Sequence, residues 1–239
     1  MSLFRGVADK LFTSVYLTSI LVSFYALFVC SEDDQDPTLP YSDPIQWLRV
    51  AKGTRFICAR WEELVGPAWI ASSGVFYGKP DMTDDIEIFK SEHGKPFEKL
   101  LTFAEDFEAM TSDDREMYRK IICYVGNIYK GIVEDRDDPM ATCRRLIAAP
   151  SKNDPRFIDL LETKQPRAMT ILAHMFACMK LIAEQVEWFK GIAERQVPRI
   201  YDQLPTGWRP MMVRLSLGPH EMLLSQCYSR IATTLGSLQ

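Results

Sequence analysis

Apolar residues recur at helical spacing along most of the chain, and the stretches that carry them tend to follow a proline. Pro44, Pro96, Pro139 and Pro166 each precede such a stretch, as do Pro67 and Pro219. Proline fits the first turn of a helix because the N–H that it lacks has no partner there. The pattern predicts helices over residues 44–65, 139–149, 166–199 and 219–235, with the third bent near Glu184 and the second ending at Pro150.

Two further features support a helical fold. Thr111 and Asp114 have the spacing of a capping pair in front of a helix that carries Met117, Ile121 and Ile128. The helix over residues 44–65 has an apolar face, which we expect to be buried. That face comprises Trp47, Ala51, Thr54, Cys58, Trp61 and Val65.

Strand signals are scarce, since only residues 213–217 alternate cleanly between apolar and polar positions. Residues 31–43 read as an acidic, proline-broken loop, and residues 72–94 as an irregular connection with several glycines. No internal repeat is present. We therefore predict an all-α, single-domain multi-helix bundle over residues 1–239.

Residues 11–30 contain no charged side chain, and 20 residues just meet the length of a membrane span. Thr13, Ser14, Thr18, Ser19 and Ser23 interrupt the apolar run, and such regularly spaced hydroxyls suit a helix packed on other helices. We expect a buried core helix here, and a membrane helix is the alternative.

Charge and cysteine usage narrow the function classes. The 239 residues include 28 Lys and Arg against 32 Asp and Glu, without a basic run. Phosphate neutralisation needs concentrated positive charge, so we expect no direct binding of nucleic acid. The six cysteines are scattered without a C-x-x-C pair, which indicates reduced, packed thiols in an intracellular protein, in the nucleus or the cytoplasm.

The sequence shows no motif for a metal or a cofactor. The P-loop, G-x-G-x-x-G, H-E-x-x-H and G-x-S-x-G patterns are all absent. Acidic runs at 81–85 and 134–138 read as a loop and a solvated helix start rather than as a metal site. Of the three histidines, His93 and His220 suit a surface, whereas His174 lies among apolar residues.

A mid-helix histidine in apolar surroundings is most often a hydrogen-bonded core residue, but it can also face a ligand. Methionines and aromatic residues follow it at helical spacing. They usually form core, yet they also line pockets for hydrophobic ligands. We predict an apolar pocket between the C-terminal helices with these lining candidates: His174, Phe176, Trp188, Tyr201, Trp208, Met211 and Met212.

Several short blocks resemble the C-terminal regulatory region of fungal zinc-cluster transcription factors, of the sterol-uptake-control type. In the second half they are Pro166-Arg167-Ala168, residues 172–177, Trp188, and Leu204-Pro205 before Trp208. In the first half they are residues 47–50 with Gly53, Trp61 with residues 64–67, and Leu11-Phe12.

The resemblance implies an all-helical domain that binds a sterol or similar hydrophobic molecule and acts through a protein partner or a second copy of itself. His174, Phe176, Trp188 and Trp208 would then be pocket or core residues. The six-cysteine zinc cluster of the family does not precede this region, so we expect regulation without a DNA-binding module of its own.

The alternative is a stand-alone enzyme of a fungal terpenoid or natural-product pathway. An apolar pocket could catalyse a redox-neutral cyclisation or isomerisation, for example of the Diels–Alder type, mainly by holding the substrate in place. One hydrogen-bond donor would polarise a carbonyl group, and the candidates for it are His174 and Tyr201. The sequence alone leaves both hypotheses open.

Overall fold

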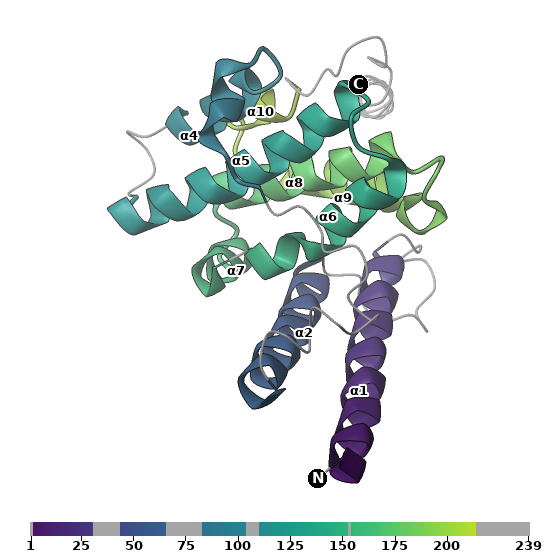
Figure 1. Ribbon diagram of the computed structural model, residues 1–239. Helices are drawn as coiled ribbons and strands as arrows, with labels where there is room; N and C mark the ends of the chain where they lie inside the picture. The colour runs from purple at the N-terminus through teal and green to yellow at the C-terminus, as the bar shows by residue number, and fades with distance from the viewer. Residues whose placement is uncertain (1, 31–43, 66–82, 104–109, 153, 214–239) are drawn as a thin grey trace, which may run out of the picture.

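The computed structural model describes residues 2–30, 44–65, 83–103, 110–152 and 154–213, and every regular element within these ranges is a helix (Figure 1). This confirms the all-α prediction. The elements are α1 (Ser2–Val29), α2 (Pro44–Val65), η2 (Ile86–Lys90), α4 (Lys95–Thr102), α5 (Ser112–Val133), α6 (Pro139–Lys152), α7 (Pro155–Glu162), α8 (Pro166–Leu181), η3 (Glu187–Phe189), α9 (Ile192–Gln203) and α10 (Arg209–Val213).

Local sequence signals set most helix starts. Pro44, Pro139 and Pro166 are the first residues of α2, α6 and α8, as predicted. The predicted capping pair is also present: Thr111 Oγ1 accepts from the N–H of Asp114, whose carboxylate accepts from the N–H of Thr111. Each bond satisfies a backbone donor that the helix start would otherwise leave without a partner.

The prediction needs two corrections between α5 and α8, one to the end of a helix and one to the number of helices. Helix α6 continues through Pro150 to Lys152 instead of ending at Pro150. Helix α7 was not predicted, although Asp154 and Pro155 supply its signal: the Asp154 side chain accepts from the N–H of Arg156 at 2.9 Å, and Pro155 opens the helix.

The single bent helix predicted over residues 166–199 is in fact two separate helices, which pack against each other in antiparallel directions. α8 ends at Leu181, the chain turns through η3, and α9 begins after Gly191 and packs back on α8. Gly191 has φ of 80°, a left-handed conformation that glycine adopts without steric cost. Apolar periodicity continues across this turn because both helices face the same core, so the pattern alone concealed the break.

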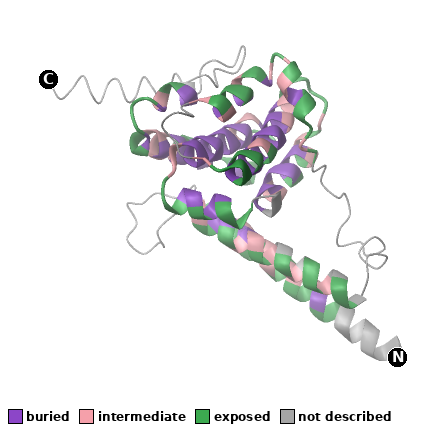
Figure 2. Ribbon diagram, turned by 90° about the vertical axis from the view of Figure 1, so that its left-hand side faces the viewer, coloured by how far each residue is buried: buried purple, intermediate pink, exposed green. Residues whose placement is uncertain are grey.

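Helix α8 lies at the centre of the body and packs against α5, α6, α7, α9 and α10 (Figures 1 and 2). Thirteen of its sixteen residues are buried. A helix that is apolar on all sides needs neighbours on all sides, and the surrounding helices provide them.

Helices α1 and α2 form a hairpin that projects from this body (Figure 2). Phe12 stacks on Trp61 with ring centroids 4.6 Å apart, and the hydroxyls of Ser23 and Thr54 lie 3.4 Å apart. The end of α1 is held in the body, where Gln196 Nε2 donates to the carbonyl of Cys30 at 2.8 Å.

The expectation of a buried core helix at residues 11–30 is wrong for most of its length. Only 22% of the apolar window at Lys10–Val29 is buried, because a single helix, α2, covers it. Within the described chain α1 is the one helix long and apolar enough to cross a membrane by length and composition. On α2, Trp47 and Ala51 are buried as predicted, and Thr54 and Trp61 are half-buried.

Other expectations fall wholly or partly outside the described residues. These are the loop at 31–43, residues 72–82 of the 72–94 connection, the short strand at 213–217 beyond Val213, the helix at 219–235, His220, Cys227, and the side chains of Cys58 and Val65. The described part of the connection contains the short helix η2. Among the described cysteines, Cys30, Cys123, Cys143 and Cys178 are free and buried, as expected of packed thiols. Burial raises the pKa of Cys123 to about 11 and that of Cys178 to about 12, so both thiols stay protonated.

Candidate functional site around helix α8

One face of α8 carries three buried polar residues in an otherwise apolar helix. Arg167, Thr170 and His174 follow one another at spacings of three and four, which places them in a row along the helix. All three are almost completely inaccessible to solvent. Their row faces α4, since Arg167 bonds to the end of that helix and His174 contacts its Phe97.

Arg167 holds the C-terminal end of α4. Its guanidinium group donates to the carbonyls of Leu100, Leu101 and Phe103, the last two at 3.0 and 2.6 Å. These carbonyls have no partner within the helix, and the positive charge also complements the negative end of the helix dipole. The guanidinium carbon lies 5.1 Å from the ring of Trp208 and 5.7 Å from that of Tyr118.

His174 is neutral at physiological pH, and its hydrogen bond determines which nitrogen carries the proton. Nδ1 lies 2.8 Å from the carbonyl oxygen of Thr170. A carbonyl can only accept, so Nδ1 donates, and Nε2 is left as an acceptor. Burial lowers the pKa of His174 to about 4. The ring also lies edge-on to Phe97, with centroids 5.5 Å apart.

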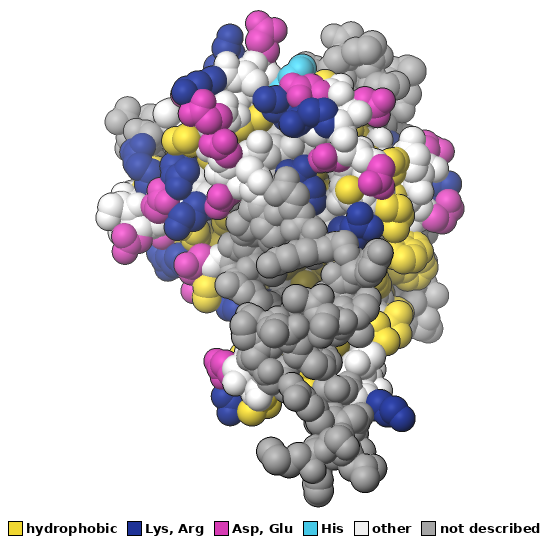
Figure 3. Space-filling view, in the orientation of Figure 1, with side chains coloured by type: hydrophobic (Ala, Val, Ile, Leu, Met, Phe, Trp, Pro, Cys, Tyr) yellow, Lys and Arg dark blue, Asp and Glu magenta, His cyan; other side chains and the backbone are white. Residues whose placement is uncertain are grey.

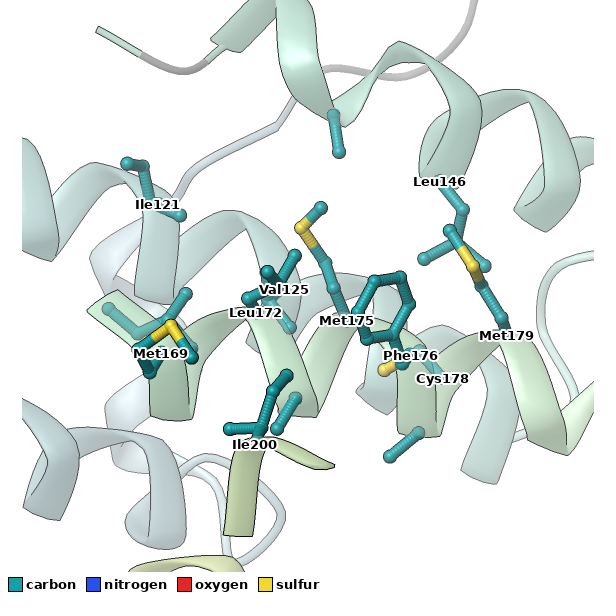
Figure 4. Close-up of a cluster of buried hydrophobic side chains, with 14 of the residues drawn as sticks. Ile121, Val125, Leu146, Met169, Leu172, Met175, Phe176, Cys178, Met179 and Ile200 are labelled. Atoms are coloured by element: carbon teal, nitrogen blue, oxygen red, sulfur yellow. The ribbon is translucent and has the colours of Figure 1, made fainter. Parts of the chain in front are cut away.

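The opposite side of α8 is a methionine-rich core (Figure 4). Phe176 points toward α2, and its ring centroid lies 6.3 Å from that of Trp47. Methionine side chains are flexible and polarisable, so they fill irregular space and adapt to a changed neighbour. The labelled members of this cluster are Ile121, Val125, Leu146, Met169, Leu172, Met175, Phe176, Cys178, Met179 and Ile200.

The predicted pocket residues occupy several different places. Trp208, Met211 and Met212 lie together at α10, which packs on α8 and places Trp208 over Arg167. Tyr201 stacks under the guanidinium of Arg209 at 5.0 Å, at the start of the same short helix. Of these four residues, Trp208 lies against Arg167, at the other end of the polar row from His174.

The other two candidates lie elsewhere. Phe176 comes two residues after His174, so it points to the opposite side of the helix. Trp188 is 54% exposed in η3 and packs against Phe24 of α1 with centroids 4.7 Å apart.

Sequence reasoning missed the role of Arg167, although the residue stood in one of the blocks that carry the resemblance. Its signal was a charge in the first turn of a helix whose following residues, up to Lys180 in the last turn, carry no charge. Such a charge must be hydrogen-bonded if the helix is buried. What the sequence could not supply is the partner, because the end of α4 lies more than sixty residues away.

The comparisons with known proteins give one match. The chain is 24% identical over 224 residues to a protein of Gibberella zeae described as a Zn(2)-C6 fungal-type transcription factor. The chain is similar to a fungal transcription factor. The match covers 87% of this chain and 43% of the relative, so this chain spans less than half of the relative's length. No family model matches, and no solved structure matches.

This relationship confirms the transcription-factor part of the resemblance and leaves its sterol-sensing part a prediction. No group of three or more potential metal ligands occurs in the parts of the chain that the structure describes. The polar row on α8 is the group of buried polar side chains on which the proposal below is built.

Proposed function

We propose that this chain is a helical regulatory domain of transcription, which responds to a hydrophobic small molecule of the sterol or terpenoid kind. The observation that carries the proposal is the similarity to a transcription factor along 87% of the chain. The chain would act in the nucleus through a protein partner, since an acidic sequence without a basic run is poorly suited to DNA phosphates.

In this proposal the ligand binds along the polar face of α8. Trp208, Met211 and Met212 would contact its hydrocarbon part, because α10 is a short helix that covers this face from one side. The Nε2 atom of His174 would accept a hydrogen bond from a ligand hydroxyl group. Tyr201 would hold α10 in place through Arg209.

In this proposal two of the predicted lining residues stay outside the pocket. Phe176 would belong to the core behind α8, and Trp188 would belong to the contact between η3 and α1. Because α8 packs against helices on all its sides, a ligand that shifted it would change the packing of the whole body. In this way ligand binding would change the surface that a protein partner contacts.

No observation favours the enzyme alternative. That hypothesis requires a hydrogen-bond donor at the reacting carbonyl, but the proton of His174 is already donated to Thr170. With a pKa of about 4, the ring gains no second proton near neutral pH. Tyr201, the other candidate donor, lies under the guanidinium of Arg209.

The test measures the binding of two compounds to the wild-type chain and to variants of two histidines. Purified protein is titrated with a sterol and with the matching hydrocarbon that lacks the hydroxyl group, with the quenching of tryptophan fluorescence as the measure. The wild-type chain should prefer the sterol by about tenfold or more, since a buried acceptor without a donor is costly. His174→Phe should remove this preference.

His93→Phe is the matched control, because His93 is half-buried in the connection before α4, where its ring lies against Tyr129. It should bind as the wild type does. Failure of both compounds to bind, or an equal preference in the two variants, would contradict the ligand proposal. Mass spectrometry of the recovered sterol completes the test, because a changed mass would favour the enzyme.

A further inference from the structure

The half of α1 that faces away from α2 is apolar and uncovered. At 100° per residue its exposed side chains fall on one side of the helix, together with the small residues Ser14 and Thr18. None of residues 11–30 is charged. The exposed apolar residues are Leu11, Val15, Leu17, Leu21, Val22, Tyr25 and Phe28.

The surroundings set this face apart from the rest of the surface. Figure 3 shows charged side chains of both signs over the upper body and apolar side chains along the flank that leads to α1. Soluble proteins rarely expose a contiguous apolar patch of more than a few hundred Å². A face of this kind indicates a binding surface.

The pairing of α1 with α2 argues against a lipid bilayer as the occupant. Phe12 and Ser23 of α1 contact Trp61 and Thr54 of α2, so the two helices run side by side over this length. α2 carries the exposed ion pair of Arg60 with Glu63 close to Trp61. A membrane that took in α1 would have to take in these charges as well, at a cost of several kcal/mol.

We propose that α1 docks against α1 of a second copy of this chain, with the two helices antiparallel about Thr18. In this register Leu11 packs against Tyr25 of the second copy, Val15 against Leu21, and Ser14 against Val22. Thr18 lies on the two-fold axis, where a small side chain lets the helices approach closely.

The pairing fits the chemistry of the face. A two-fold interface must be complementary to itself, and an uncharged face meets this condition without repulsion between like charges. The pairing buries the side of α1 that one hairpin leaves uncovered, with α2 of each copy on the outside.

The size of the face also fits. Seven side chains that are each about half exposed or more offer several hundred Å², which approaches the ~800 Å² that one partner gives to a standard interface. Ser14 donates to the carbonyl of Lys10 within its own helix, so its hydroxyl group does not need water. The inference does not depend on the ligand proposal.

The test uses the full chain and the two residues that the register brings together. Sedimentation equilibrium should show a dimer for the wild type. Val15→Lys and Leu21→Glu should each weaken the dimer about a hundredfold, because each buries a charge without a partner. The double variant should regain affinity to within about tenfold of the wild type, because each lysine then faces a glutamate of the other copy.

Val133→Glu is the control, since Val133 is a similarly exposed apolar residue at the end of α5 in the body. It should leave the dimer unchanged, and circular dichroism should show the same helicity in every variant. Thr18→Cys should form a disulfide-linked dimer on mild oxidation, and Val133→Cys should not.

Three results would overturn the proposal. The first is a wild type that stays monomeric at every concentration. The second is a dimer that Leu21→Glu does not weaken, and the third is a dimer that the double variant fails to restore. Flotation of the wild type with neutral phosphatidylcholine vesicles, lost in Leu21→Glu, would identify lipid as the occupant instead.

Discussion

Helices α1 and α8 are both predominantly apolar, yet the fold treats them in opposite ways. α8 has neighbours on every side, and even its arginine and histidine are removed from solvent. α1 has one neighbour along most of its length and leaves half of its circumference uncovered. The apolar composition of a helix thus indicates how much of its surface has to be buried. It does not indicate whether the same chain or another molecule buries that surface.

The largest expected effect is a difference in stability loss when a leucine is replaced by alanine in each of the two helices. Leu172 in α8 is completely buried, whereas Leu21 in α1 is 67% exposed. Leu172→Ala should lower the free energy of unfolding by about 2–5 kcal/mol, through lost burial and the cavity that it leaves. Leu21→Ala should change it by less than about 0.5 kcal/mol in a solution dilute enough to dissociate the proposed dimer.

Urea denaturation followed by circular dichroism measures both values. Similar losses of stability in the two variants at low protein concentration would contradict the contrast between a buried α8 and an exposed α1. They would mean that α1 is covered within a single copy. At high concentration the effect of Leu21→Ala should grow, since the proposed dimer then contributes to stability.

The next effect concerns pH and tests how closed the body is around His174. The pKa of this residue is about 4 in the folded chain against an ordinary 6.5, so the unfolded chain takes up its proton first as the pH falls. Stability is therefore full above pH 6.5 and is lost as the pH falls toward 4. The loss between pH 6.5 and 5 should be about 2 kcal/mol.

His174→Phe removes this titration and should show a flat profile over the same interval. The interval lies above the ordinary pKa of 4.5 for Glu116 and of 3.8 for Asp114. The pKa of each is lowered in the folded chain, so the stability that these two carboxylates contribute is lost mainly below the interval. Equal slopes in the wild type and the variant would mean that solvent reaches the ring, unlike the dry surroundings described for α8.

The smallest effect concerns local signals within the body. Thr111→Ala removes the capping bond of α5 and should cost about 1 kcal/mol. Gln165→Ala should cost almost nothing, because the Gln165 side chain makes no capping bond at the start of α8. Thermal unfolding of both variants measures the difference. A loss at Gln165 as large as that at Thr111 would show that side-chain caps are not what fixes these helix starts.

The sequence predicted what is decided within a few residues. Pro44 and Thr111 act on the backbone next to them, so the starts of α2 and α5 could be read directly. The turn between α8 and α9 could not, because it depends on Gly191 and on a core that both helices share. The exposure of α1 depends on how many neighbours assemble around it, which no local pattern records.

In the candidate site, too, the features set by neighbouring residues could be predicted and those set by distant contacts could not. The burial of His174 was expected from its apolar neighbours, and the structure adds its partner, Thr170. The separation of Phe176 and Trp188 from the other pocket residues depends on which helices meet. Arg167 went unnoticed because its partners lie at the end of a distant helix.

The guanidinium group of Arg167 touches three helices at once: it belongs to α8, holds the last carbonyls of α4, and lies against Trp208 beside α10. A planar cation of fixed shape cannot follow one of these neighbours without losing the others. A shift of α10 would therefore disturb the end of α4 as well. A single side chain thus joins α4, α8 and the residue before α10 at one end of the molecule.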